Sequence, residues 1–307
     1  MNKSTFNLSE DYINKIKNIN NNKILERLSN IADIINRNKI KYNLNDVRIL
    51  DNLSYNIVAE ATSQKYGNVI IKIIIDDSMN SSEIAMLKLY NGKFACKLLE
   101  ENSKDNVYIL EKLSPGNKLI DLQNLENSTE IICNLIDNLV IPYNDNIFNL
   151  KISFYNDILN KAFSYAENIN YFSEYISFAQ KIYLNIKTKN LPLFYLHNDL
   201  HHYNILKSGN EYKAIDPHGV IGEKIFEYPP YIINEFWNNN FNCNHIMKVI
   251  NKVSKYSKEN RKDILEATYI HLLLSTIWFK EDNMRDDLIK NNLSCLNFLK
   301  EVLNKWL

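Results

Sequence analysis

The spacing of apolar residues changes along the first third of the chain. Residues 8–38 carry isoleucine and leucine three and four positions apart, which predicts two short helices separated by the asparagine cluster at 18–22. β-branched runs then predict antiparallel strands over 47–50, 56–61, 68–75, 94–100 and 107–112. One helix, opened by Ser81 or Ser82 as its N-cap, should interrupt these strands. The pattern indicates a small β-rich lobe.

Helical spacing dominates the remainder. Proline and glycine at 114–117 break regular structure and indicate a linker. Helical patterns follow over 125–139, 148–167, 171–188, 246–253, 263–279 and 288–303. Between them, residues 193–222 form a polar island with short apolar flanks. We therefore predict an α+β protein with an N-terminal lobe over 1–113 and a larger, mainly helical C-terminal lobe over 114–307.

Composition and charge narrow the classes of function. The 307 residues are 45% hydrophobic and 23% charged, as in ordinary globular proteins, and the formal net charge is zero. A neutral chain lacks the basic surface that general nucleic-acid binding requires, so no nucleic-acid partner is expected. No apolar run is long enough for a membrane span, and the first residues lack the apolar core of a signal peptide. We expect a cytoplasmic protein without a membrane partner.

The polar island contains three residues at a spacing that suits phosphoryl transfer. This reaction needs an aspartate that orients the acceptor hydroxyl and takes its proton, and an asparagine a few residues later that reaches magnesium. A second aspartate from the next hairpin then bridges the nucleotide phosphates through metal. Asp199, Asn204 and Asp216 stand in this order. We predict Asp199 as the catalytic residue and Asn204 and Asp216 as ligands of Mg²⁺.

These residues carry a resemblance to a known family. The pattern His197-x-Asp199-x-x-x-x-Asn204 with Ile215-Asp216 resembles the aminoglycoside-phosphotransferase family, which shares the protein-kinase fold. The runs DLHHYN at 199–204 and AIDPHG at 214–219 resemble its streptomycin phosphotransferase branch. The resemblance implies a bilobal kinase-like fold with ATP or GTP between the lobes. It further implies a cationic aminoglycoside such as streptomycin as phosphate acceptor, and hence antibiotic resistance.

Upstream residues fit the same resemblance. Lys72 lies in the third predicted strand, where a kinase keeps the lysine that contacts the α- and β-phosphates, and Glu83 in the next helix is placed to pair with it. A lysine in a buried strand would be costly without such a partner. Glu111 and Leu113 end the last strand in a segment that resembles the adenine-reading hinge. One departure is the turn at 51–56, which has no glycine.

Acceptor residues are predicted from charge. A polycationic acceptor calls for carboxylates that pair with amines or guanidinium groups, and we select Glu223, Glu227 and Glu235. His202 either lines the acceptor pocket or packs beneath the loop, whereas His197 should brace the loop through hydrogen bonds. The neighbouring aromatic residues serve core packing or stack on a guanidinium; they are Tyr228, Tyr231, Phe236 and Trp237.

Three other functions are compatible with these sequence features. The first is a kinase for another hydroxylated metabolite, a sugar or an amino alcohol. The second is a metal-dependent hydrolase, because four residues of the types that bind zinc lie within six positions, namely His197, Asp199, His201 and His202. The third is a pseudokinase that binds nucleotide without transfer, suggested by the glycine-free turn. The presence of all four residues of the predicted machinery argues against it: Lys72, Asp199, Asn204 and Asp216.

Overall fold

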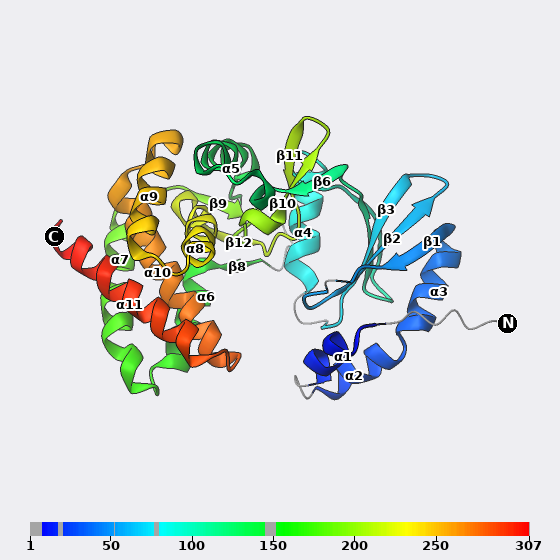
Figure 1. Ribbon diagram of the computed structural model, residues 1–307, viewed down its shortest axis with the longest axis horizontal. Coiled ribbons are helices and arrows are strands. Elements are labelled where there is room, and N and C mark those ends of the chain that lie inside the picture. Colours follow the sequence, from blue (N-terminus) through cyan, green and yellow to red (C-terminus); the bar gives the residue numbers. More distant parts are fainter. Residues whose placement is uncertain (1–7, 18–20, 52, 77–79, 145–151, 307) are drawn as a thin grey trace. The chain divides into compact units, whose positions relative to one another are not determined.

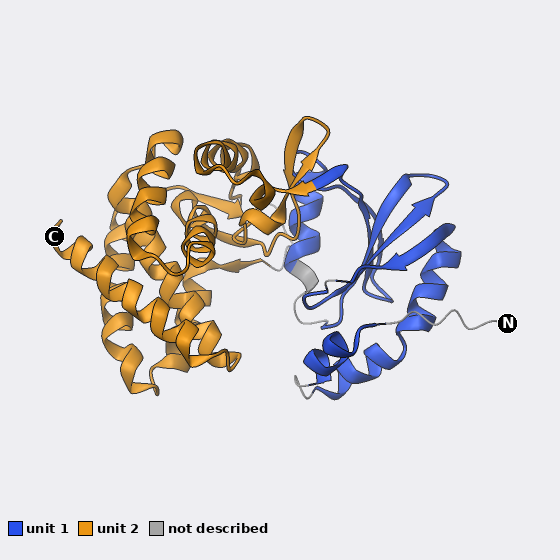
Figure 2. Cartoon of the chain, in the orientation of Figure 1, with its two compact units in different colours: residues 1–116 blue, residues 117–307 orange. Residues whose placement is uncertain are grey.

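The structure is a computed structural model that describes residues 8–17, 21–51, 53–76, 80–144 and 152–306 (Figure 1). The chain divides into two compact units, residues 1–116 and 117–307 (Figure 2). The division falls inside the segment at 114–117 in which we expected a linker. The first unit holds an antiparallel sheet and the second is mainly helical, so the fold is of the α+β class.

The first unit is built on a five-stranded antiparallel sheet in the order β1-β2-β3-β5-β4. Its strands are β1 (Leu44–Ile49), β2 (Ile57–Ser63), β3 (Gly67–Ile73), β4 (Leu98–Asn102) and β5 (Val107–Glu111). Alternate residues of β3, among them Val69, Ile71 and Ile73, are buried in the core that the N-terminal helices also join. Residues 94–97, which we predicted as strand, precede β4, and Phe94 has a positive φ of 56° that a strand does not allow.

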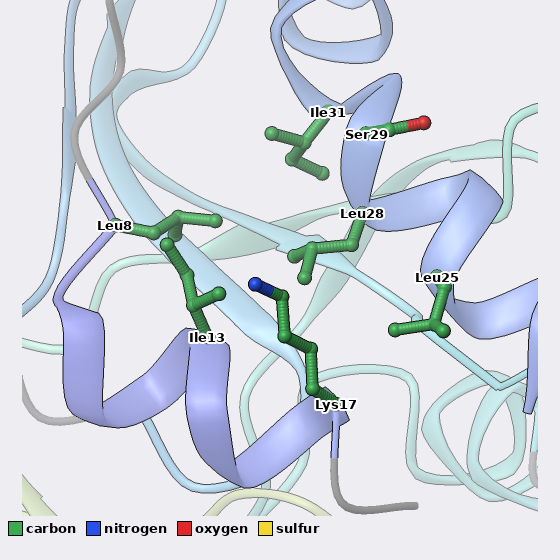
Figure 3. A pocket seen from close by; sticks show the side chains of 7 residues that line it. All are labelled: Leu8, Ile13, Lys17, Leu25, Leu28, Ser29 and Ile31. Atoms are coloured by element: carbon green, nitrogen blue, oxygen red, sulfur yellow. The ribbon is translucent and has the colours of Figure 1, made fainter. Parts of the chain in front are cut away.

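Three helices precede the sheet, where the sequence predicted two. They are α1 (Glu10–Lys17), α2 (Asn22–Ser29) and α3 (Ile31–Lys41). The additional break is at Asn30, whose φ of −95° and ψ of 7° lie outside helical values. A cavity of about 590 Å³ beside these helices is lined mainly by apolar side chains, with the Lys17 amine among them (Figure 3). None of the predicted site residues lines this cavity.

A polar network fastens α3 to the sheet. The Asp105 carboxylate accepts hydrogen bonds from Asn38 Nδ2 at 2.8 Å and Asn102 Nδ2 at 3.1 Å, and it pairs with Arg37 at 2.9 Å. Asn38, Asn102 and Asp105 are all buried. Because buried amides need partners, this network fixes how α3 lies against the turn between β4 and β5.

Helix α4 (Asn80–Tyr90) connects β3 to β4. Ser81 and Ser82 lie inside its first turn, so neither is the N-cap that we predicted. The cap position itself lies outside the described residues. Glu83 also falls in this first turn.

Helices make up most of the second unit. They are α5 (Leu125–Leu139), α6 (Tyr155–Ala166), α7 (Ser173–Thr188), α8 (Pro229–Asn238), α9 (Cys243–Ser257), α10 (Arg261–Glu281) and α11 (Asp286–Asn304). The bounds of α5 match the prediction. The predicted start of the next helix at 148 lies outside the described residues, and α8 was not predicted at all. Among the described helices, none combines the length and apolar character that crossing a membrane requires.

Short strands position the polar island within this unit. β7 (Ile141–Pro142), β9 (Leu193–Leu196), β12 (Val220–Glu223) and β8 (Ser153–Phe154) form a four-stranded sheet in that order. The hairpin β10 (Ile205–Ser208) and β11 (Glu211–Ala214) follows the island's first loop, and β6 (Pro115–Lys118) precedes the short helix η2 (Leu119–Leu122). Of two further short helices, η4 (His202–Asn204) lies inside the island and η5 (Lys224–Glu227) follows it. The polar residues thus lie between strand ends.

We predict that Asp105→Ala destabilises the first unit. The substitution leaves the buried amide donors of Asn38 and Asn102 short of an acceptor, at a cost of about 1–3 kcal/mol for each. A lower midpoint of thermal unfolding would measure this. Asp33→Ala, which removes an exposed carboxylate from the same helix, is the matched control and should change the midpoint little. Equal effects of the two substitutions would contradict the role of the network.

Candidate active site

The candidate site is built on two loops, residues 197–204 after β9 and residues 215–219 after β11. Two non-glycine residues in them have a positive φ: Asn198 with a φ of 61° and Asp216 with a φ of 56°. Asn and Asp tolerate this region better than most residues, which explains why the sequence can turn at these two positions without glycine. The loops are joined by hydrogen bonds from Ile215 N to Asn204 O (2.9 Å) and from His218 N to His197 O (3.0 Å).

Asp199 is held by its neighbours while its carboxylate stays accessible. Asn204 Nδ2 donates to Asp199 Oδ2 at 2.8 Å and to the Asp199 carbonyl at 3.0 Å. The Nε2 atoms of His218 and His201 lie 3.5 and 3.7 Å from the same carboxylate oxygen. Burial lowers the pKa of His201, which favours a neutral ring there. The Asp199 side chain is 27% exposed, so a ligand can reach it.

Asn204 and Asp216 offer oxygen ligands of the kind that magnesium prefers. Because the Asn204 amide nitrogen is committed to Asp199, its Oδ1 must face away from that residue, and no described residue donates a hydrogen bond to it. Asp216 is half-buried and follows Ile215, which is bonded to the Asn204 backbone. The chemistry of this pair therefore fits a divalent cation with oxygen ligands.

His197 braces the two loops as we expected. Its ring Nε2 lies 2.9 Å from the Ile215 carbonyl and its Nδ1 accepts a hydrogen bond from the Asp199 backbone N–H at 3.3 Å. Both contacts are satisfied by a neutral ring protonated on Nε2. Burial lowers the pKa of His197 to about 3, so the ring stays in this form at neutral pH.

The buried carboxyl group of Glu227 supports the backbone of the 197–204 loop. Glu227 has no exposed surface, and its two carboxylate oxygens accept a hydrogen bond from the backbone N–H of Asn198 at 3.0 and 3.3 Å. Burial raises the pKa of Glu227 to about 8, while hydrogen bonds from the Asn198 and His197 backbone act in the opposite direction. This contact fixes the backbone immediately before Asp199.

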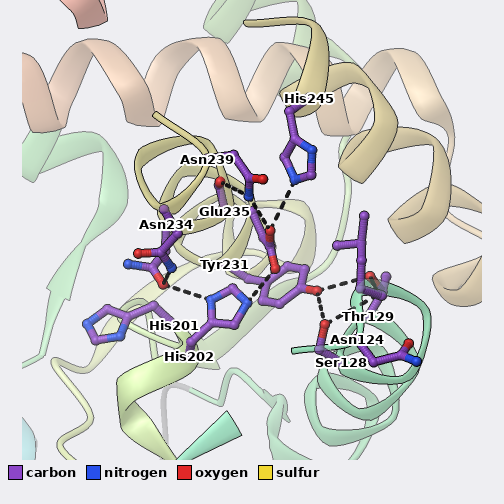
Figure 4. A network of polar contacts seen from close by, with 12 residues as sticks. Asn124, Ser128, Thr129, His201, His202, Tyr231, Asn234, Glu235, Asn239 and His245 are labelled. Carbon is purple, nitrogen blue, oxygen red and sulfur yellow. Dashed lines mark hydrogen bonds and ion pairs between the residues drawn. The ribbon is translucent and has the colours of Figure 1, made fainter. Parts of the chain in front are cut away.

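The His202 ring lies in a polar network with residues of α8 and α9 (Figure 4). Its Nδ1 lies 2.7 Å from Asn234 Oδ1, and its Nε2 lies 2.8 Å from Glu235 Oε1. The ring stacks on Tyr231 with centroids 4.5 Å apart. The other carboxylate oxygen of Glu235 contacts His245 Nε2 at 3.1 Å. His202 therefore packs beneath the loop, and it also lines a cavity beside it.

The three predicted acceptor carboxylates have different surroundings. Glu223 is 2% exposed, pairs with Lys187 at 3.1 Å, and stands opposite Leu193, at the end of β9 remote from the loop. Glu227 is committed to the loop backbone, as described above. Glu235 lines the cavity that His202 also lines. Of the three, Glu235 alone is among the residues that line this cavity.

Sequence reasoning missed most of the network around His202. Tyr231 OH contacts the hydroxyl oxygens of Ser128 and Thr129 at 2.8 and 3.0 Å, and Asn239 Nδ2 donates to Glu235 Oε2 at 3.1 Å. The spacing of Tyr231, Asn234, Glu235 and Asn238 could have indicated one polar face of a helix. Tyr231 itself is fully buried, as the core-packing alternative predicted.

The predicted ion pair is present in the first unit. Lys72 Nζ lies 2.7 Å from Glu83 Oε1, and both residues are buried, with exposed fractions of 5% and 8%. Glu111 ends β5 and accepts a hydrogen bond from the Lys97 backbone N–H at 3.1 Å, and Leu113 is buried just beyond it. The 51–56 turn includes Asn52, which lies outside the described residues.

A zinc hydrolase does not fit the histidines. Both ring nitrogens of His197 and both of His202 contact protein atoms, so they cannot bind a metal in this arrangement. Within the described part of the chain, no three His, Cys, Asp or Glu side chains gather in a way that could hold a metal ion.

We predict that Glu227 makes stability depend on pH. Its carboxyl has a pKa of about 8 in the folded chain, against an ordinary value of 4.5, so the folded state binds the extra proton between these limits. Its contribution to the free energy of unfolding is complete below about pH 4.5. This contribution declines as the pH rises to about 8, by at most about 1.4 kcal/mol per pH unit. Unfolding measured from pH 5 to 8 should show a shallower decline for Glu227→Gln than for the wild type. Parallel curves would contradict the assignment.

Comparisons with known proteins identify the family. Residues 43–283 match the family model described as aminoglycoside/hydroxyurea antibiotic resistance kinase. A 40-residue segment is 50% identical to a streptomycin 3″-kinase of Klebsiella pneumoniae, a match that covers 13% of this chain and 15% of that relative.

Solved structures show the same fold at low sequence identity. A choline/ethanolamine kinase family protein from Mesorhizobium loti superposes with a TM-score of 0.63 at 13% identity, over 88% of this chain and 95% of that one. The streptomycin–ATP–APH(2″)-IIa ternary complex gives a TM-score of 0.57 at 14% identity, over 87% and 96%. The fold is therefore protein-kinase-like, with an antiparallel β-rich N-terminal part and a helical C-terminal part. Since the family model spans most of its length, the chain belongs to the family described as aminoglycoside/hydroxyurea antibiotic resistance kinases.

Proposed function

We propose that this kinase transfers the γ-phosphate of ATP to a hydroxyl of an aminoglycoside such as streptomycin. The observation that carries the proposal is the 2.8 Å hydrogen bond between Asn204 Nδ2 and Asp199 Oδ2, which holds an accessible carboxylate at a defined position in the polar island. The short match to a streptomycin 3″-kinase supports the choice of acceptor.

In this mechanism, Asp199 acts on the acceptor. Its carboxylate accepts a hydrogen bond from the acceptor hydroxyl, orients the oxygen toward the γ-phosphorus and takes the proton as the new P–O bond forms and the bond to the β-phosphate oxygen breaks. The Asn204 contact fixes the carboxylate rotamer, while His197 and Glu227 accept hydrogen bonds from the backbone N–H groups of Asp199 and Asn198. Such positioning supplies most of the catalysis that a protein can offer to phosphoryl transfer.

Asn204 Oδ1 and the Asp216 carboxylate would hold magnesium, which neutralises charge on the nucleotide phosphates. Lys72, fixed by Glu83, would contact the α- and β-phosphates. The backbone between Glu111 and Leu113 would contact the adenine ring. The Lys72–Glu83 pair supports this role because two buried charges are costly unless their geometry is good, and a 2.7 Å contact provides it.

A second candidate function is phosphorylation of a smaller amino alcohol. Similarity of the fold to a choline/ethanolamine kinase family protein favours this alternative, although identity is only 13%. A screen that couples ADP formation to a colour change, run with the purified chain against streptomycin, other aminoglycosides, choline, ethanolamine and hydroxyurea, separates the two functions. Nucleotide binding without turnover of any compound would instead indicate a binding-only protein.

We predict that Asp199→Asn lowers kcat with the identified acceptor by about 10²–10⁴-fold, because the amide cannot take the proton. ATP affinity, measured by calorimetry, should stay close to that of the wild type. Asp282→Asn, which removes an exposed carboxylate at the end of α10, is the matched control and should retain full turnover. Near-normal kcat in the Asp199 variant would exclude this residue as the base.

We further predict that Asp216→Asn raises the magnesium concentration required for half-maximal activity by at least about tenfold. Asparagine tolerates the left-handed backbone at this position, so the loop should keep its shape while one negative charge is lost. A magnesium titration of the initial rate measures the effect. An unchanged titration curve would mean that Asp216 does not bind the metal.

A further inference from the structure

A cavity of about 330 Å³ lies within the second unit, beside the network of His202 and Glu235 (Figure 4). Its walls come from η2, the start of α5, the 197–204 loop, the end of α8 and the start of α9. The lining contains one carboxylate, that of Glu235, and no lysine or arginine. Four amide side chains line it as well: Gln123, Asn124, Asn238 and Asn239.

These amides keep hydrogen-bonding capacity that no described residue uses. Asn124 Oδ1 caps α5 by accepting from Asn127 N, which leaves Nδ2 as a donor. Asn238 and Asn239 donate through Nδ2 to Asn234 and Glu235, which leaves their Oδ1 atoms as acceptors. Gln123 makes no side-chain hydrogen bond to the described residues. Donors and acceptors side by side suit hydroxyl groups, because each hydroxyl both donates and accepts.

The Glu235 carboxylate, by contrast, is largely occupied by neighbouring side chains. One oxygen contacts His202 Nε2 at 2.8 Å, and the other contacts His245 Nε2 and Asn239 Nδ2, both at 3.1 Å. The residue is 9% exposed. A carboxylate offers about four acceptor sites and these contacts use three of them, so little of the Glu235 carboxylate is left for an ammonium or guanidinium group. Glu235 therefore orders the wall of the cavity and does not present a free negative charge.

We propose that the cavity binds an uncharged, hydroxyl-bearing ring of the acceptor through its amide side chains, with Glu235 as the positioning residue that holds His202, Asn239 and His245. The inference rests on the proposed function, since it concerns the acceptor of the same reaction. The volume is near the lower end of the range of ligand pockets, about 300–1,000 Å³, so one ring fits and a multi-ring acceptor extends beyond it. Apolar side chains of Leu119, Ile120 and Leu125 cover the C–H face of the ring.

The first test is equilibrium binding of streptomycin to the full chain, measured by calorimetry. Asn238→Leu should weaken binding at least about tenfold, because it removes an acceptor and fills part of the cavity. Asn244→Leu is the matched control: this exposed asparagine lies on α9 next to His245 but does not line the cavity, and its Kd should match the wild type. Equal binding by all three proteins, with normal thermal unfolding, overturns the proposal.

The second test separates a positioning residue from a counter-ion. The Kd of Glu235→Gln and of the wild type is measured over a series of salt concentrations. If Glu235 is a positioning residue, the variant binds more weakly but log Kd changes with log salt concentration as steeply as in the wild type. If Glu235 pairs directly with a charged group of the acceptor, this dependence is less steep in the variant, which overturns the assignment.

Failure of the proposed function is seen separately. Streptomycin that binds without being phosphorylated contradicts that function, while the two binding tests still decide the role of the cavity. If streptomycin does not bind, the same variants are tested with the acceptor found in the screen, and absence of binding by every compound in it overturns the proposal.

Discussion

The hydrogen bond from Asn198 N–H to the buried carboxyl group of Glu227 holds the backbone on which the polar island depends. Asn198 adopts a left-handed backbone conformation immediately before Asp199. Such a conformation is strained and persists only where the surrounding structure holds it, so the same loop without buried partners would adopt other conformations. The buried carboxyl group selects the left-handed one, and His197 then ties the same turn to Ile215. The positions of Asp199 and Asp216 follow from these two contacts, although neither supporting side chain is reached by solvent.

Helix α8 connects this support to ligand recognition. Tyr231, Asn234, Glu235 and Asn238 recur three or four residues apart and so lie on one face, where the first three contact His202 and the last lines the cavity. The hydroxyl groups of Ser128 and Thr129 on α5 fix Tyr231 from the other side. A single helix face thus supports the 197–204 loop and forms part of the wall that we assign to the acceptor.

Much of the fold and part of the site could be predicted from sequence. The contacts that could be predicted join residues close in the sequence, and those that were missed join residues far apart. Asp199 and Asn204 are five positions apart, and Lys72 and Glu83 pair within one strand–helix unit, so local spacing carried the information. Glu227 lies 29 positions from Asn198, and Glu235 lies 33 from His202, so their partners depend on tertiary packing that no local pattern encodes. Helix α8 was missed because its proline pair and aromatic residues obscured a polar face that becomes visible only once His202 is placed against it.

The residues that line the cavity fall into a buried group, the inner wall, and an exposed group, the mouth, which differ in their hydrogen bonds to the 197–204 loop. His202 and Glu235 belong to the inner wall and are buried in contacts with the loop, whereas Gln123, Asn124 and Asn238 are exposed at the mouth and make no hydrogen bond to the loop. If the cavity binds the acceptor as we propose, substitutions at these exposed residues can change which compounds are accepted while the contacts that hold the 197–204 loop stay in place.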